Sequence, residues 1–311
     1  MISAFLLVMP VFALVFAGWL AGRTEVLGPA ATGEINRFVV WLALPALLFD
    51  IIASAHWSDL WQPGFVAVFT LSGLLSMAVA MFACFRRHRN LADAAIEGLN
   101  AGYSNIGFVG FPIVLAALGQ GALIPATIGS IITMCVIFAT TIIIVEAALQ
   151  SQASRFSLPG NVARTLIRNP ILVASASATA FPILGIELPA SAQTLLKLLG
   201  GAAAPCALVA LGLFLASKRE MNSRGFGAPI FLSGCKLILH PVLAWLLAYF
   251  AFHLPPFSIQ AAVLLAALPA GTGSFMLAEF YCRDARSSSR TIILSTLASI
   301  GTISICLAIL Q

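Results

Sequence analysis

Two short segments combine helix-breaking residues with polar side chains inside long apolar stretches. The first, SNIGFVGFP, covers residues 104–112, and the second, LPAGTGS, covers residues 268–274. Glycine and proline interrupt a helix, and the helix that follows begins with backbone N–H groups that have no partner within it. These groups carry a partial positive charge and bind anions. The two segments therefore predict an anion-binding site built largely from backbone.

Each residue type in these segments has a physical role in such a site. Asn105 and Thr272 can orient a ligand through hydrogen bonds, and glycines let the ligand approach the backbone closely. Pro112 suits the first turn of a helix because it lacks an N–H group. The candidate substrate-binding residues are Ser104, Asn105, Gly107, Gly110, Pro112, Pro269, Gly271, Thr272, Gly273 and Ser274. Two simple proline kinks are the alternative interpretation.

A third candidate is a charge deep within an apolar stretch. Lys236 lies about ten residues, or roughly 15 Å of helix, beyond residue 227, and His240 follows one turn later. Lys236 can balance the charge of an anion or exchange a proton, with His240 tuning it. Alternatively, Lys236 pairs with an acid such as Glu279 or Glu146 and holds helices together.

Apolar stretches dominate the chain that carries these residues. Of its 311 residues, 60% are hydrophobic and 9% are charged, far from the balance of a soluble globular domain. A helix needs about 20 apolar residues to cross a bilayer. Suitable stretches lie at residues 3–22, 34–54, 63–85, 94–118, 122–147, 164–183, 192–216, 227–250, 258–281 and 289–310. The sequence predicts an all-α integral membrane protein with ten transmembrane helices.

The basic residues predict how the chain is oriented. Of its 16 lysines and arginines, 14 lie in the odd-numbered loops between these stretches. Loops rich in lysine and arginine face the cytoplasm, so both termini are expected outside an inner (cytoplasmic) membrane. The net charge of +5 therefore reflects topology and does not indicate nucleic-acid binding. The first stretch lacks a basic n-region and is expected to be retained as a span.

Prolines recur at one interval along the chain. Pro10 and Pro170 are 160 residues apart, as are Pro45 and Pro205, and Pro269 corresponds to position 109 inside the first segment. This interval predicts two five-helix repeats, residues 1–150 and 151–311. An odd number of spans inverts the second repeat. Such inverted repeats are common in secondary transporters, where discontinuous helices, here the fourth and ninth spans, cross near the bilayer midplane.

Several motifs together resemble one known family, in the family's order along nearly the whole chain. They are WLALPALLF (41–49), NIGFVGFPIVLAALG (105–119), NPILVA (169–174), AAAPCALVALG (202–212), KLILHP (236–241) and LPAGTGSFMLAEFY (268–281). The chain resembles the auxin efflux carriers, in particular the bacterial members that are similar to malonate transporters.

The resemblance implies a fold like that of sodium/proton antiporters and bile-acid carriers. Spans 1, 2, 6 and 7 would form a scaffold, and spans 3–5 and 8–10 a mobile core that moves as an elevator, often in a homodimer. The family's crossover asparagine, glycine and prolines correspond to Asn105, Gly107, Pro112 and Pro269. Unlike plant members, the chain has a short linker at 148–163 and a small AGTGS sequence, which favours a small bacterial-type substrate over auxin.

The leading functional hypothesis is a secondary carrier for a small organic anion, a mono- or dicarboxylate such as malonate or malate. The chain has no G-x-x-x-x-G-K-[ST] motif for nucleotides, and no cofactor or metal is expected. Uniport driven by the membrane potential and proton coupling through Lys236 and His240 both stay open, whereas sodium coupling fits less well. An intramembrane enzyme using the serine of GTGS, or a ligand-binding sensor, is the alternative.

Overall fold

The computed structural model describes residues 2–54, 61–150, 170–217 and 225–310. The first part forms α1 (Ile2–Arg23), α2 (Ala31–Phe38), η1 (Val39–Ala43), α3 (Leu44–Ala53), α5 (Pro63–His88), α6 (Leu91–Gly102), η2 (Ile106–Gly110), α7 (Phe111–Leu118), η3 (Gln120–Ala122), α8 (Leu123–Ile131), η4 (Ile132–Ile137) and α9 (Phe138–Gln150). The second part forms α11 (Pro170–Leu184), α12 (Ala190–Ala216), α14 (Gly227–Gly234), η5 (Cys235–Leu239), α15 (His240–Leu246), η6 (Leu247–Ala251), α16 (Pro256–Ala266), α17 (Gly273–Phe280) and α18 (Arg286–Leu310). Apart from η3, the η elements are π-helical turns within longer helices.

The helices coincide with the predicted apolar stretches as far as the described residues reach. Six helices are long and apolar enough to cross a membrane: Ala31–Ala53, Pro63–Arg87, Gln120–Leu149, Ala190–Ala216, Gly227–Ala251 and Arg286–Ala308. The other predicted spans correspond to α1, to the shorter α11 and to two interrupted helices, α6–α7 and α16–α17. The chain is therefore an all-helical, multi-pass membrane protein in its described part, and the count of ten spans stays a prediction.

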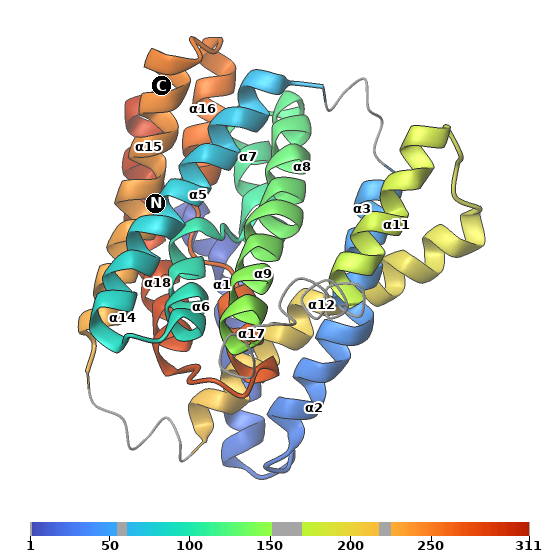
Figure 1. Ribbon diagram of the computed structural model, residues 1–311, viewed down its shortest axis with the longest axis vertical. Coiled ribbons are helices and arrows are strands. Elements are labelled where there is room, and N and C mark those ends of the chain that lie inside the picture. Colours follow the sequence, from blue (N-terminus) through green and yellow to red (C-terminus); the bar gives the residue numbers. More distant parts are fainter. Residues whose placement is uncertain (1, 55–60, 151–169, 218–224, 311) are drawn as a thin grey trace.

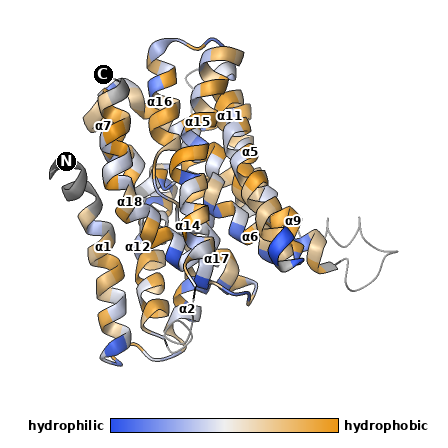
Figure 2. Ribbon diagram, turned by 90° about the vertical axis from the view of Figure 1, so that its left-hand side faces the viewer, coloured by the Kyte–Doolittle hydropathy of each residue, from blue (hydrophilic) through white to orange (hydrophobic). Residues whose placement is uncertain are grey.

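Apolar side chains cover much of the outer surface of these helices. Figure 2 shows apolar residues along α1 and a hydrophilic loop at its end. On α5, Leu71, Val79 and Phe82 are exposed, and a bilayer rather than water is the medium that such a surface suits.

The helices pack in two groups. In the first group, α12 packs along α1, α2 and α3, and α11 packs on α3; Figure 1 shows α2, α3, α11 and α12 at the right of the molecule. The second group contains α5–α9 and α14–α18, with α5 on α6 and α15 on α16. Contacts between the groups run mainly through α2 with α17, α1 with α18 and α3 with α8.

Glycines allow α1 and α12 to approach each other at backbone distance. A Cβ atom at Gly18 would overlap the carbonyl oxygen of Val209, and one at Gly212 would overlap that of Val15. Small residues at such positions are typical of helix packing in membranes, where close van der Waals contact drives association. The first group is therefore a tightly packed unit around α12.

Both interrupted helices break a few residues away from the expected positions. The first break covers residues 103–105, and the second covers 267–272. Gly107 and Gly110 lie in η2, which continues directly into α7. The expectation that Pro112 begins the outgoing half-helix is wrong, since that half begins at Ile106. A π-helical turn accommodates the glycines without ending the helix.

Some sequence-based interpretations fall outside the described residues. The boundary between the two predicted repeats, at residues 150 and 151, adjoins such a segment. The basic residues of the fifth and seventh loops also lie outside the described part: Arg155, Arg164, Arg168, Lys218, Arg219 and Arg224.

Candidate functional site

The two breaks lie against each other and pair through their backbones. The Asn105 N–H donates to the Pro269 carbonyl at 2.9 Å, and the Gly271 N–H donates to the Tyr103 carbonyl at 2.9 Å. Between these bonds, Ser104 and Ala270 form an antiparallel bridge. The pairing satisfies backbone groups that no helix satisfies here, which non-helical backbone at membrane depth requires.

The outgoing halves of both helices begin beside this pairing. One half begins at Ile106 and the other at Gly273. The first N–H groups of each half have no carbonyl partner inside their own helix. Two partially positive helix ends therefore lie close to the paired backbone segments.

The incoming halves end with carbonyl groups that side chains from neighbouring helices cap. The hydroxyl oxygen of Ser76 lies 3.1 Å from the Ala101 carbonyl oxygen at the end of α6. The Lys236 ammonium donates to the Ala266 carbonyl, the last residue of α16, at 2.6 Å. The second cap is the stronger one, because a positive charge complements the negative end of a helix.

A cavity of about 240 Å³ lies between the paired segments and the first helix group. Its lining residues are Leu44, Leu47, Tyr103, Ser104, Asn105, Ile106, Gly107, Met134, Gly200, Gly201, Ala203, Ala204, Pro205, Gly271, Thr272 and Met276. One wall is polar backbone and short polar side chains, and the opposite wall, from α3 and α12, is apolar. No charged side chain is among these described lining residues, so any positive potential in the cavity comes from the backbone.

Two polar side chains at this cavity have unused hydrogen-bonding capacity. Ser104 is 2% exposed, and its hydroxyl has no hydrogen-bond partner within the described part of the chain. Asn105 is 8% exposed, and its backbone rather than its side chain takes part in the pairing with Pro269. Buried polar groups of this kind are available to a ligand.

Half of the candidate substrate-binding residues line the cavity. Ser104, Asn105, Gly107, Gly271 and Thr272 do so. The remaining candidates are not part of the lining: Gly110, Pro112, Pro269, Gly273 and Ser274.

These remaining residues shape the crossing instead. The Pro269 carbonyl accepts the bond from Asn105. A Cβ atom at Gly110 would lie 2.8 Å from a Leu268 methyl carbon, and one at Gly273 would lie 2.9 Å from the Tyr103 ring. Their small size therefore permits close packing of the two breaks.

Ser274 belongs to a buried polar network that sequence reasoning missed. Its hydroxyl donates to the Asn100 Oδ1 atom at 2.6 Å, and the Asn100 Nδ2 atom donates to the Ser288 hydroxyl at 3.1 Å. The Ala270 N–H donates to the Ser295 hydroxyl at 3.1 Å. This network joins α6, α17 and α18 around the crossing. It also contradicts a nucleophilic serine, since Ser274 bonds to an amide and not to a histidine.

Lys236 and His240 contact each other as their spacing predicts. The Lys236 Nζ atom lies 3.0 Å from the His240 Nδ1 atom, and both side chains are fully buried. The alternative in which Lys236 pairs with Glu146 or Glu279 is wrong for the described residues: Glu146 instead accepts from the Tyr281 hydroxyl at 2.7 Å. Neither Lys236 nor His240 lines the cavity, so Lys236 can influence it only through α16.

The apolar wall of the cavity was also missed at the level of residues. Leu44 and Leu47 lie in the WLALPALLF motif, and Gly201 and Pro205 lie at or beside the AAAPCALVALG motif. The proline shared by these motifs and their resemblance to a family were the available signals. Apolar residues carry no chemical signature, however, that separates a substrate wall from ordinary helix packing.

Comparison with known proteins agrees with this architecture. The chain matches the family described as membrane transport protein over residues 3–307. A protein named "Putative malonate transporter" from Rhizobium meliloti (strain 1021) is 32% identical over 302 residues, covering 96% of this chain and 92% of that protein. "Uncharacterized transporter YfdV" from Escherichia coli (strain K12) is 28% identical, covering 94% of this chain and 93% of that protein.

A more distant relative comes from an archaeon. An "Uncharacterized transporter" from Methanothermobacter thermautotrophicus is 27% identical over 297 residues and covers 94% of each chain. The matches span almost the entire sequence, including both breaks and the cavity wall. The chain is therefore a transporter rather than an enzyme, and it belongs to the membrane transport protein family, that of the auxin efflux carriers.

Proposed function

We propose that the protein moves a small organic anion, a mono- or dicarboxylate such as malonate or malate, across the cytoplasmic membrane. The observation that carries the proposal is the cavity at the paired breaks, where two helix N-termini and the Asn105 side chain face an enclosed space. Helix N-termini stabilise anions without a neutralising side chain. The substrate would therefore be held by hydrogen bonds and partial charges, which permits its release.

The size and polarity of the cavity support a small substrate. At about 240 Å³, it lies below the range of about 300–1,000 Å³ typical of sites for drug-sized ligands. A short dicarboxylate presents charged oxygens at its ends and methylene groups between them. The polar wall suits the first and the apolar wall of α3 and α12 suits the second.

The proposed mechanism is an elevator-type alternating access. The two helix groups would act as the scaffold (spans 1, 2, 6 and 7) and the mobile core (spans 3–5 and 8–10), with the cavity between them. Extensive packing within each group and limited contact between them support a rigid-body movement. A homodimer formed through the scaffold, with both termini outside, belongs to the same proposal.

The pairing of the breaks supports the inverted-repeat part of the proposal. Exchanging Tyr103 with Pro269 and Asn105 with Gly271 converts one of the two backbone bonds into the other. A two-fold axis between Ser104 and Ala270 would produce this relation. The corresponding positions are then 166 residues apart rather than 160, so a few residues separate the spacing here from that of the prolines.

Lys236 and His240 provide two routes for driving transport. A permanently charged Lys236 would act as a fixed positive charge on the core, and uniport would then follow the membrane potential. Exchange of a proton between Lys236 and His240, 3.0 Å apart, would instead couple transport to the proton gradient.

Flux into liposomes tests the proposal directly. The purified protein is reconstituted, and uptake of C2–C6 mono- and dicarboxylates is measured under imposed proton and sodium gradients and under a membrane potential. We expect saturable flux of a short dicarboxylate, dependent on Asn105. No saturable flux of any of these carboxylates would contradict the proposed function, and ligand binding without flux would favour a sensor.

A further inference from the structure

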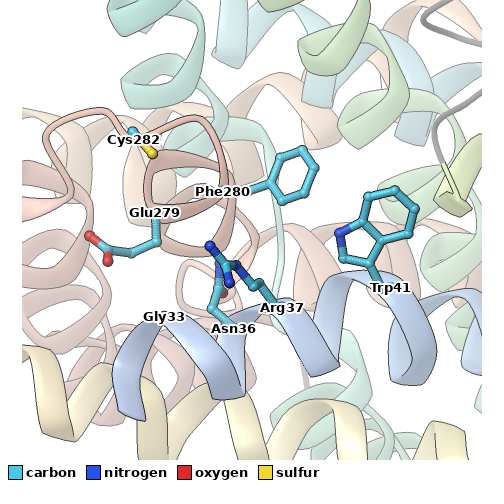
Figure 3. Close-up of a pocket in the computed structure, with 7 residues that line it drawn as sticks. All are labelled: Gly33, Asn36, Arg37, Trp41, Glu279, Phe280 and Cys282. Carbon is cyan, nitrogen blue, oxygen red and sulfur yellow. The ribbon is translucent and has the colours of Figure 1, made fainter. Parts of the chain in front are cut away.

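A second cavity, of about 320 Å³, lies between α2–η1 and the end of α17. Its residues come from both helix groups: Gly33, Asn36, Arg37 and Trp41 from one, and Glu279, Phe280 and Cys282 from the other. Figure 3 shows the Asn36 and Arg37 side chains rising from one helix toward Glu279 and Phe280. The cavity therefore lies on the surface along which the proposed scaffold and core would move.

One hydrogen bond connects this cavity with the crossover cavity. Asn36, which is 2% exposed, donates from its Nδ2 atom to the Met276 carbonyl at 3.1 Å. Met276 itself lines the crossover cavity. The Asn36 to Met276 bond, which joins α2 to α17, thus stands between the two cavities.

The Asn36 amide is only partly satisfied in this position. Its Oδ1 atom is buried and has no hydrogen-bond partner in the described part of the chain. A buried acceptor without a donor offsets part of what the Nδ2 bond contributes. The amide is therefore held by one bond to a neutral carbonyl, and a stronger acceptor can displace that carbonyl.

Arg37, the next residue, supplies a cation that is free to change partner. Its guanidinium bonds to Glu34 at 3.2 Å in a pair whose side chains are 71% and 66% exposed. Exposed pairs of this kind contribute little. The cavity also adjoins the first and ninth loops, both on the side that the basic residues predict to be cytoplasmic.

We propose that this cavity is an inner vestibule with a second, transient site for the carboxylate substrate. A carboxylate that binds Arg37 accepts the Nδ2 hydrogen bond of Asn36 in place of the Met276 carbonyl, because a charged acceptor bonds more strongly than a neutral one. Losing that bond frees α17 from α2. The inference rests on the proposed function and adds a trigger to it: arrival of substrate releases the core from the scaffold.

The opposite wall keeps the vestibule site weak. Glu279 and the aromatic contact between Trp41 and Phe280, with ring centroids 6.4 Å apart, lie across from Arg37. The Glu279 carboxylate repels an anion. A substrate therefore passes through the vestibule, whereas the crossover cavity, which has no charged lining residue in the described chain, holds it longer.

Cys282 allows the vestibule to be observed apart from the crossover. It lines the vestibule, and it is the exposed one of the six cysteines. The rate of its reaction with a maleimide is measured in proteoliposomes with and without malonate, in the wild type and in Arg37→Gln, Asn105→Ala and Arg86→Gln. Arg86 is an exposed arginine on α5 and serves as the matched control.

Malonate at ten times its vestibule dissociation constant should slow labelling of Cys282 about tenfold in the wild type. The same protection is expected in Asn105→Ala and Arg86→Gln and should be lost in Arg37→Gln. No effect of malonate on the wild type would overturn the vestibule, as would protection that depends on Asn105 and not on Arg37. If wild-type flux is saturable and Asn105-dependent while Cys282 stays unprotected, only the vestibule fails and the proposed function stands.

The trigger has its own readout. Asn36→Asp keeps the size of the side chain but removes the donor, and Asn36→Ala removes both. Without the bond to Met276, the empty core should move more freely, so the ratio of net uptake to malonate exchange should rise about fivefold in both variants, as one hydrogen bond predicts. An unchanged ratio in both variants would overturn the trigger.

Discussion

At the scale of single residues, the crossover cavity relies on backbone and on uncharged side chains. Asn105 is the residue there whose side chain offers both a donor and an acceptor, and the bond from its main chain to Pro269 fixes where that side chain lies. Sequence reasoning could find Asn105 because it stands out among glycines and apolar residues. It could not separate Ser104 from Ser274, since only the packing of α6 against α17 sends Ser274 to Asn100.

Replacing Asn105 tests whether this side chain contacts the substrate. Asn105→Ala leaves the backbone bond to Pro269 in place and removes the side-chain amide. A hydrogen bond to a charged group contributes about 1.5–3 kcal/mol, so the dissociation constant for malonate should rise at least about tenfold. Calorimetric titration in detergent measures it. Unaltered affinity would show that the side chain does not contact the anion.

Gly107 offers a steric test of the same cavity. A Cβ atom there meets no protein atom within 4 Å, and the position lines the cavity. Gly107→Ala should therefore fold normally but raise the KM for the carboxylate, more strongly for longer substrates. Gly234→Ala, equally free of contacts but outside the cavity lining, is the matched control. Equal KM values in both variants would argue against substrate in this cavity.

At the scale of elements, the two half-helix ends at the crossing are capped unequally. Ser76 caps α6 with a hydroxyl, whereas Lys236 caps α16 with a charge. These residues are 160 residues apart, the interval of the repeated prolines. The sequence predicted both breaks because glycine and proline cluster there, but it misplaced the first one. A glycine permits a helix to end without requiring it, and here η2 continues through Gly107 and Gly110.

Lys236→Met tests what the charged cap does. The variant leaves the Ala266 carbonyl and the His240 ring without their partner, but it also relieves the cost of burying a charge. Thermal stability should consequently change little, whereas transport should fall at least about tenfold if the charge at the end of α16 sets the potential of the crossing. Ser76→Ala, which removes the uncharged cap, should lower stability by about 1 kcal/mol and leave most of the transport.

The two variants together discriminate between structure and electrostatics. A loss of transport that scales with the loss of stability in both would assign Lys236 a purely structural role. Transport by Lys236→Met with the same rate and the same pH dependence as the wild type would remove Lys236 from the mechanism. Both outcomes are read from liposome flux at several pH values beside a thermal unfolding curve.

At the scale of the whole molecule, the two helix groups meet at few places, and the crossover cavity lies between them. Hydropathy predicted the helices well because the bilayer imposes their length and composition. The grouping of these helices came from family resemblance and not from hydropathy, since lipid-facing and helix-facing apolar residues look alike in a sequence. The glycines that bring α1 and α12 together, Gly18 and Gly212, show their role only once their neighbours are known.

Movement of one group past the other predicts that a link between them stops transport. Trp41 and Phe280 face each other across the boundary at a centroid distance of 6.4 Å, and Phe49 and Phe181 face each other within the scaffold at 5.3 Å. In a Cys282→Ser background, cysteines replace one pair at a time and a short bismaleimide joins them. The link at positions 41 and 280 should abolish flux, and that at 49 and 181 should leave it intact, because only the first spans the boundary. Full flux with both links formed would mean that the groups do not move as rigid bodies.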